Sequence, residues 1–339
     1  MTRETIIEFD LTDDEVCRIR QEVAHAARHF PDPADPAQYD DHRFIDAGLP
    51  GRLKTALETF RRTESAAGLL IRGFPVDDRR VGPTPGHWDQ RAVPGATLEQ
   101  ELFLAMCATA LGQPFAFSTL QFGRMIQDIL PIRGDEERQS GHGSTTLLEF
   151  HTEDGFHPGR CDYLLLFGLR NQDRVPTILS SIREVELCDE DLEILMRPVS
   201  HILPDDEHIR QLRSRYPDHP AVSRMEGMRD SPEAVPVLFG DRERPYLRID
   251  LPFMRFADDG PEVKRALNRL MTELERVQHS VVVEQGSLLV IDNYLAVHGR
   301  RPFPVRYDGS DRWLKRMLVS RDLRKATPVS QLVDSRVLF

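Results

Sequence analysis

The stretch GSTTLLEFHTEDGFHPGRCDYLLLFGLR, residues 143–170, places two expected strands on either side of a polar turn. Residues 147–150 and 162–169 are apolar runs of strand length, and the Gly and Pro residues between them are typical of a turn. Because side chains alternate along a strand, His151 and Glu153 should point to the same side where the first strand ends. An imidazole and a carboxylate that converge in this way can hold a metal ion.

A third ligand is expected from far along the chain, where His298 follows the apolar strand predicted at 287–292 and a tight turn. Two His and one carboxylate form the facial triad that leaves positions open on non-haem Fe(II). His157 is the competing ligand, but the Pro and Gly that follow it indicate a turn. Zinc accepts the same donors, so a zinc hydrolase or a non-catalytic metal-binding protein is the alternative class.

The bulk properties exclude several classes of protein. A length of 339 residues allows one large domain or two ordinary ones, and the net charge of −11 argues against binding nucleic acid through a basic surface. The four cysteines show no pairing or metal-type spacing, which favours a reducing compartment, expected to be the cytoplasm. No secretory signal and no membrane span are expected, because no apolar run is long enough.

Helices are expected mainly before residue 115 and strands after it. The spacing of Thr12 and Glu15 predicts a capping box for a helix that ends near Arg28. Further helices are predicted at 52–63, 97–111, 186–196 and 261–278, and strands at 6–11, 68–73, 121–129, 147–151, 162–169, 177–181, 234–239, 246–250, 281–284, 287–292 and 316–320. This order predicts a mainly β core, a sandwich or a barrel, with helices that buttress one face.

A single domain is expected across 1–339. Within it, we predict a helical buttress at 1–114, a β core at 115–325 that contains an irregular, charged insertion around 197–235, and a tail at 326–339. The Pro-rich loop at 75–95 and the segment 203–235 are hypothesised to be lids over the site.

Basic and polar residues outside the triad suggest how small molecules bind. Arg312 lies fourteen residues after His298 (312 − 298) and could anchor the far end of a metal-bound dicarboxylate, because an arginine donates two hydrogen bonds to one carboxylate. Surface pairing of Arg312 with nearby aspartates is the alternative. Gln121, His142 and Asp250 could contact an amino-acid substrate. Gln121 could instead satisfy backbone groups, and Asp250 could cap a turn.

The chain resembles the Fe(II)/2-oxoglutarate-dependent oxygenases of the clavaminate synthase-like group, and among them the free amino acid β-hydroxylases of non-ribosomal peptide antibiotic pathways. The resemblance covers most of the chain. The motifs that carry it are PVDD at 75–78, PTPGHW at 83–88, GRMIQDILPIRG at 123–134, FHTEDGFHP at 150–158, CDYLLLFGLRN at 161–171, LLVIDNYLAVHGRRPF at 288–303, RYDGSDRWLKR at 306–316 and SRDLRK at 320–325.

The resemblance implies a double-stranded β-helix, or jelly-roll, core. It implies that His151, Glu153 and His298 bind the iron. It also implies that Arg312, with Arg316 nearby, binds the distal carboxylate of 2-oxoglutarate, and that O2 is the second co-substrate. Gln121 and Asp250 fall where members of the group contact the amino acid. Related halogenases replace the carboxylate of the His-x-Glu motif with a small residue, so the resemblance implies a hydroxylase.

For the substrate, the resemblance implies a free polar L-amino acid that is hydroxylated at the β-carbon. Arginine or a related basic amino acid is the first choice. The arginine enzymes of this group carry an Asp-x-Asp pair at the end of one strand, where this chain has Asp250-Leu251-Pro252. Asparagine or another polar amino acid is therefore the alternative, and desaturation on the same site is a second one.

Overall fold

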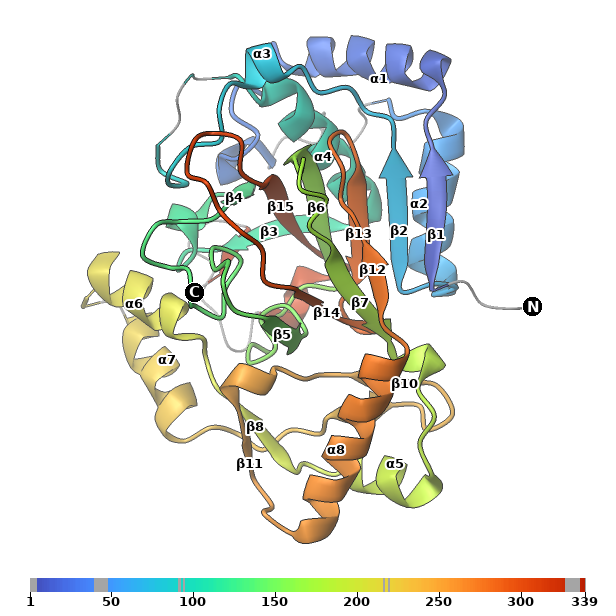
Figure 1. Ribbon diagram of the computed structural model, residues 1–339, viewed down its shortest axis with the longest axis vertical. Helices are drawn as coiled ribbons and strands as arrows, with labels where there is room; N and C mark the ends of the chain where they lie inside the picture. The colour runs from blue at the N-terminus through green and yellow to red at the C-terminus, as the bar shows by residue number, and fades with distance from the viewer. Residues whose placement is uncertain are drawn as a thin grey trace.

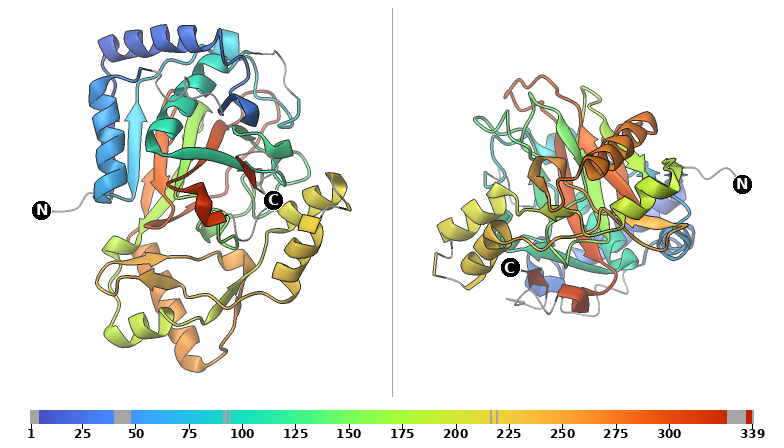
Figure 2. Two further views of the ribbon diagram at one scale, coloured as in Figure 1. Left: turned by 180° about the vertical axis from the view of Figure 1, so that it is seen from behind. Right: turned by 90° about the horizontal axis from the view of Figure 1, so that it is seen from below.

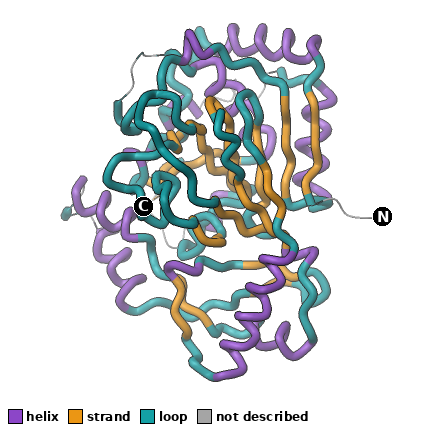
Figure 3. The backbone as a smooth tube through the Cα atoms, viewed as in Figure 1, coloured by secondary structure: helices purple, strands orange, loops and turns teal. Residues whose placement is uncertain are grey.

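Two β-sheets lie at the centre of the molecule and helices surround them (Figures 1 and 3). This computed structural model describes residues 5–39, 48–90, 93, 95–215, 217–218, 220–326 and 336–338. Among these residues, no helix combines the length and the apolar character that crossing a bilayer requires.

The larger sheet has eight strands, and it includes strands from both ends of the chain. In spatial order they are β1 (Ile6–Asp10), β2 (Gly68–Arg72), β13 (Leu288–Asp292), β6 (Tyr163–Arg170), β15 (Trp313–Ser320), β3 (Gln113–Phe117) and β16 (Val337–Leu338), while β4 (Gln127–Ile129) also pairs with β15. The pairs β1–β2 and β3–β16 are parallel, and the other pairs are antiparallel. Strand β6 is buried along its whole length, as its continuous apolar run predicts.

Helices cover the outer face of this sheet, as the view from behind shows (Figure 2). They are α1 (Asp13–Ala26), α2 (Gly51–Thr63), the short α3 (Asp78–Val81) and α4 (Leu98–Leu111). Their apolar side chains join those of β2, β6, β13 and β15 in one buried cluster. Helix α1 begins with the predicted capping box, in which Thr12 accepts the N–H of Glu15 and the Glu15 side chain accepts the N–H of Thr12.

The smaller sheet has four antiparallel strands, β12 (His279–Val281), β7 (Thr177–Ser181), β14 (Ala296–Arg300) and β5 (Leu148–His151). Its apolar side chains form a second buried cluster with the inner face of the larger sheet. The two sheets therefore pack face to face. Strand β14 was not predicted, because Gly299 and Arg300 interrupt its apolar pattern; its pairing with β5 and β7 on either side compensates for that weak local propensity.

The segment 197–235 was predicted to be irregular, and this was wrong. It contains β8 (Ser200–Ile202), α6 (Asp206–Arg215) and α7 (Pro220–Asp230). Both helices are short and charged, so their local pattern is weak. They are stabilised by burying Ile209 and Leu212 of α6 against Val222 and Met225 of α7. In Figure 1 they form a pair beside the sheets.

The rest of the chain completes the lower part of the molecule in Figure 1. It comprises α5 (Asp189–Leu195), β9 (Leu238–Gly240), β10 (Pro245–Leu247), β11 (Met254–Phe256) and α8 (Pro261–Arg276), with β9 paired to β10 and β8 to β11. Helix α8 was predicted at 261–278; one apolar face of it is buried, and Ser180 of β7 donates a hydrogen bond to the Leu274 carbonyl. The predicted strand at 121–129 is limited to β4, because a 3-10 turn occupies Gln121–Gly123.

Candidate metal centre

Three side chains, two from the paired strands β5 and β14 of the smaller sheet and one from the turn after β5, meet at one point. His151 ends β5 and faces His298 of β14 directly across the antiparallel pair, while Glu153 follows two residues after His151. The Glu153 Oε2 atom lies 3.3 Å from His298 Nε2 and 4.0 Å from His151 Nε2. One nitrogen or oxygen atom from each side chain lies within 4.8 Å of the others, which is the arrangement of a metal site.

The protonation of these groups suits a metal ligand. His151 Nδ1 lies 2.8 Å from the Glu149 carbonyl, so the hydrogen bond assigns the proton to Nδ1 and leaves the Nε2 lone pair directed toward Glu153. Burial, together with the charge of His298, lowers the pKa of His151 to about 4. His151 is therefore a neutral imidazole near pH 7, and neutral imidazole is the form that binds metals.

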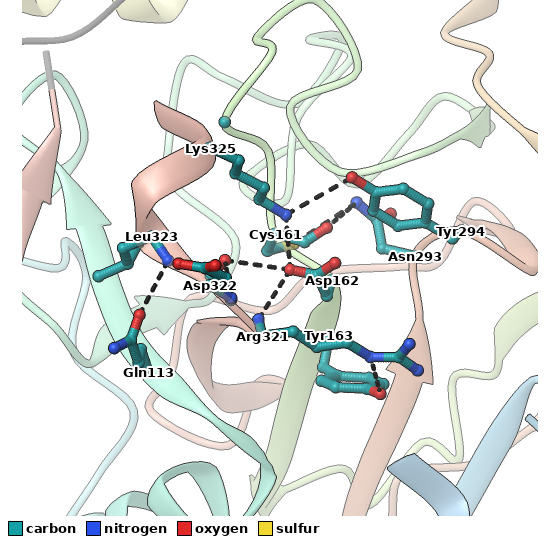
Figure 4. A network of polar contacts seen from close by, with 12 residues as sticks. Gln113, Cys161, Asp162, Tyr163, Asn293, Tyr294, Arg321, Asp322, Leu323 and Lys325 are labelled. Atoms are coloured by element: carbon teal, nitrogen blue, oxygen red, sulfur yellow. Dashed lines mark hydrogen bonds and ion pairs between the residues drawn. The ribbon is translucent and has the colours of Figure 1, made fainter. Parts of the chain in front are cut away.

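Glu153 is held in place by its backbone and by its second carboxylate oxygen. Asn293 accepts the N–H of Glu153 at 2.7 Å and donates to its carbonyl at 3.0 Å. The same Asn293 amide donates to the carbonyl of Cys161, within the polar network of Figure 4. Burial raises the pKa of Glu153, but Arg316, 2.5 Å away, and His298 outweigh it, so the net pKa is lowered. Two imidazoles and an ionised carboxylate at the end of one cavity fit a divalent iron.

This cavity lies between the two sheets and has a volume of about 130 Å³. Its wall on one side carries two buried arginines, Arg300 of β14 and Arg312 at the start of β15. Arg312 donates to the Thr177 hydroxyl of β7 at 3.4 Å. The predicted surface pairing of Arg312 is not found, since neither arginine forms an ion pair with a carboxylate of the described residues.

Three aspartates also line the cavity. Asp250 pairs with His151 through an isolated β-bridge, Asp154 follows Glu153, and Asp205 precedes α6. Burial, with the charges of Asp205, Glu153 and Asp154, raises the pKa of Asp250 well above its usual range. The cavity thus brings together a metal-type cluster, two arginines and three aspartates.

Two predicted substrate residues line the cavity but have other partners. The Gln121 amide donates to the Asp128 carbonyl at 2.8 Å and accepts the Asp128 N–H at 2.9 Å, which is the backbone role considered above. His142 Nδ1 lies 3.0 Å from the Leu130 carbonyl. His157, the rival ligand, accepts the Gly159 N–H at 3.0 Å and is not part of the metal-type cluster.

Sequence reasoning missed several residues of this site. Only a weak indication pointed to Asn293, namely a polar residue beside Asp292 at the end of a buried strand. Asp205 lies in a segment without periodicity, and its position depends on how α6 packs. Arg300 was visible only as the third residue of the His298-Gly299-Arg300 run.

Comparisons with known proteins agree on one family. The taurine catabolism dioxygenase TauD, TfdA family matches residues 200–318. Enduracididine β-hydroxylase of Streptomyces hygroscopicus is 36% identical over 344 residues, covering 98% of this chain and 100% of the relative. L-ornithine/L-arginine 3-hydroxylase of Catenulispora acidiphila is 35% identical over 338 residues, covering 97% of this chain and 98% of the relative.

The same similarity extends to solved structures. The non-haem iron oxygenase OrfP in complex with Fe, succinate and (3S)-hydroxy-L-Arg has a TM-score of 0.90 at 37% identity, covering 98% of this chain and 99% of that one. OrfP in complex with Fe and α-ketoglutaric acid has a TM-score of 0.85 at 37% identity, covering 98% and 100%.

Proposed function

We propose that this chain, which belongs to the TauD/TfdA family of Fe(II)/2-oxoglutarate-dependent dioxygenases, hydroxylates the β-carbon of a free basic L-amino acid, with arginine or a related guanidine as first choice. The enzyme uses Fe(II), 2-oxoglutarate and O2. The observation that carries the substrate proposal is the cluster of aspartates around the buried Asp250 in the same cavity as the two arginines.

His151, Glu153 and His298 are the proposed iron ligands. Their convergence, the Nδ1 proton of His151 and the two hydrogen bonds between the Asn293 side chain and the Glu153 backbone all support this role. When bound, Fe(II) supplies the activation of O2 that is coupled to decarboxylation of 2-oxoglutarate. The chain supplies a site whose geometry is fixed before the substrates arrive.

The co-substrate is proposed to lie toward Arg312, whose guanidinium binds the distal carboxylate beside Thr177. Arg316 is proposed to assist. It donates to both Glu153 and Gln127, so it also orients the carboxylate ligand.

The amino acid is proposed to place its cationic side chain among Asp154, Asp205 and Asp250. Asp250 is buried and feels the charges of Asp154 and Asp205, and a guanidinium or ammonium would offset this repulsion. Pro252 removes the second acid that an Asp-x-Asp pair would have on this strand. Asp205 supports the same role from another segment, because its charge acts directly on Asp250. The names of the relatives, which act on enduracididine, ornithine or arginine, point the same way.

We also infer that the facing sheets form a double-stranded β-helix and that the chain is one oxygenase domain, built of a buttress at 1–114, a core at 115–325 and a tail at 326–339. The inner cluster shared by both sheets supports the facing arrangement, and the presence of β1, β2 and β16 in the larger sheet supports a single domain that includes the buttress and the tail. The four free cysteines support a reducing compartment such as the cytoplasm, and the relatives support a role in antibiotic biosynthesis.

The alternative substrate is asparagine or another neutral polar amino acid, which would leave the three carboxylates without a cation. A screen separates the two. The protein would be incubated with Fe(II), ascorbate and 2-oxoglutarate against each free L-amino acid, and an added oxygen would be measured together with succinate. We expect oxidised products from arginine and its basic analogues. A product from asparagine alone would contradict the proposal, and a mass loss of two hydrogens would indicate desaturation.

A charge variant tests the proposed contact. Replacing Asp250 with Asn should raise KM for a basic substrate by about tenfold or more, because a charge-assisted hydrogen bond is lost. The matched control is Asp259→Asn, an exposed aspartate paired with Lys264, which should leave KM unchanged. Equal KM values for both variants would rule out Asp250 as the contact.

A further inference from the structure

Arg300 is a buried cation that the ligand set described above does not use. It lies on β14 two residues after His298, so both side chains point to the inner face of the smaller sheet. Its exposed fraction is 3%. The residue between them must be small, since a Cβ on Gly299 would lie 2.6 Å from the Leu148 carbonyl oxygen. The close approach of β14 to β5 thus fixes the direction of Arg300.

Arg300 converges with Arg312 on one point of the cavity wall. Across the antiparallel pair of β14 and β7, Arg300 lies directly opposite Thr177. The Thr177 hydroxyl is also the group to which Arg312 donates at 3.4 Å. Three segments, β7, β14 and the start of β15, therefore bring a hydroxyl and two guanidinium groups together.

These two guanidinium groups have unused hydrogen-bond donors. Arg300 donates from Nη1 to the Gly143 carbonyl at 2.5 Å, but its Nε and Nη2 have no partner, and neither does Nε of Arg312. Both guanidinium groups are buried. Two buried positive charges on the same cavity wall, with N–H donors that have no acceptor, form a site that favours an anion.

A purely structural role does not account for this arrangement. Support of the Gly143 carbonyl uses one of the donors of Arg300, and its stacking on Phe303, at 4.8 Å, needs no buried charge. Both remaining donors are buried beside the residue that binds the co-substrate.

We propose that Arg300 is a second anchor for the distal carboxylate of 2-oxoglutarate, acting with Arg312 and Thr177. The pocket would then select dicarboxylate 2-oxo acids against monocarboxylate ones, because only a distal carboxylate engages both guanidinium groups. This inference rests on the use of 2-oxoglutarate and on the proposed role of Arg312, and it is independent of which amino acid is hydroxylated.

The test compares two ligands without any amino acid or O2. Mn(II)-loaded protein would be titrated calorimetrically with 2-oxoglutarate and with 2-oxopentanoate, which has a methyl group in place of the distal carboxylate. Arg300→Gln should weaken 2-oxoglutarate binding by about tenfold or more and leave 2-oxopentanoate unchanged. The matched control is Arg301→Gln, one residue away and exposed, which should bind both as the wild type does.

Equal weakening of both ligands would overturn the proposal and make Arg300 a support for the Gly143 loop, and unchanged 2-oxoglutarate binding would overturn it as well. If Arg300→Gln does not fold, Arg300→Lys answers the question. Lysine keeps the positive charge but cannot donate two parallel hydrogen bonds to one carboxylate, so this variant should bind 2-oxoglutarate more weakly and 2-oxopentanoate as before. A wild-type protein that prefers neither ligand would refute the co-substrate pocket itself, whereas a failed amino-acid screen would leave this result standing.

Discussion

At the scale of single residues, Asn293 connects the core to the metal centre. Its side chain bonds the backbone of Glu153 on both sides and also the Cys161 carbonyl (Figure 4). Replacing Asn293 with Ala should lower the affinity for Fe(II) or Mn(II) by about 10- to 100-fold, as the loss of a residue that orients a metal ligand does. Metal titration followed by calorimetry measures this.

The control for that variant is Asn268→Ala, on the exposed face of α8, which should bind metal as the wild type does. If Asn293→Ala bound metal equally well, the carboxylate would be positioned by Arg316 alone.

Asp292, the neighbour of Asn293, makes stability depend on pH. It is buried and accepts the N–H groups of Tyr294 and Leu295. Burial raises its pKa to about 7, whereas an unfolded aspartate has a pKa of about 3.9. The folded state therefore holds this proton more tightly, and the stability that results is present below about pH 4 and is lost as the pH rises through about 7.

Asp292→Asn keeps an acceptor and cannot ionise. Its free energy of unfolding should exceed that of the wild type at pH 8, by at most about 4 kcal/mol for a shift of this size, and the gain should shrink steadily toward pH 5. Urea unfolding at several pH values measures the difference. A gain that did not vary with pH would mean that ionisation of Asp292 is not its cause.

At the scale of elements, the His208 side chain links helix α6 to the turn that follows β5. His208 Nδ1 lies 2.6 Å from the Thr119 hydroxyl, and its Nε2 lies 3.0 Å from Asp154 Oδ1. Because Asp205 precedes this helix, a loose α6 would also displace one of the aspartates that are proposed to bind the substrate. We expect the opening of α6, rather than global unfolding, to respond to this link.

His208→Ala should lower the local opening free energy of α6 by about 1–3 kcal/mol, since it leaves buried polar partners unsatisfied. Amide hydrogen exchange over Asp206–Arg215 should become faster, and KM for the amino acid should rise. His279→Ala, which removes an exposed imidazole beside Glu184, is the control. Unchanged exchange would show that α6 is held by its apolar contacts with α7.

The elements also show where sequence reasoning succeeded and where it did not. The capping box of α1, the apolar strand β6 and the helix α8 were predicted, because each depends on a local pattern. The predicted strand end at His151, with Glu153 two residues later, is also present. Helix α6 and strand β14 depend on tertiary partners, so their own residues carried little signal.

The site divides in the same way. The convergence of His151, Glu153 and His298 was accessible from spacing and from the resemblance, and their role as ligands stays a prediction. The contacts of Asn293 and of Arg300 join segments more than a hundred residues apart. No local pattern encodes such a pairing.

At the scale of the whole molecule, β15 joins the helical layer to the cavity. Lys315 is buried on its outer face, 2.8 Å from Glu101 Oε1 of α4 and 2.6 Å from Asp128 Oδ1 of β4. Trp313 donates to the same Asp128 carboxylate. This network ties α4, β4 and β15 together behind the arginines of the cavity.

Lys315→Met should lower the free energy of unfolding by about 3–5 kcal/mol, because it leaves two carboxylates buried without their cation. Lys264→Met removes an exposed pair with Asp259 and should cost less than about 1 kcal/mol. Urea midpoints compare the two. Further replacement of Glu101 and Asp128 by Gln and Asn should recover most of the loss, and equal effects of the two lysine variants would refute the network's contribution.

The alternation along β15 also limits how this sequence can change in length during evolution. Leu314 and Arg316 face the cavity, while Trp313, Lys315 and Met317 face the helices. One inserted or deleted residue within this run would exchange the two sets, burying a tryptophan in the cavity and an arginine among apolar helices. Descendants of this gene can therefore lengthen or shorten the preceding loop at 301–311, but the spacing from 312 to 317 should stay constant wherever the enzyme remains active.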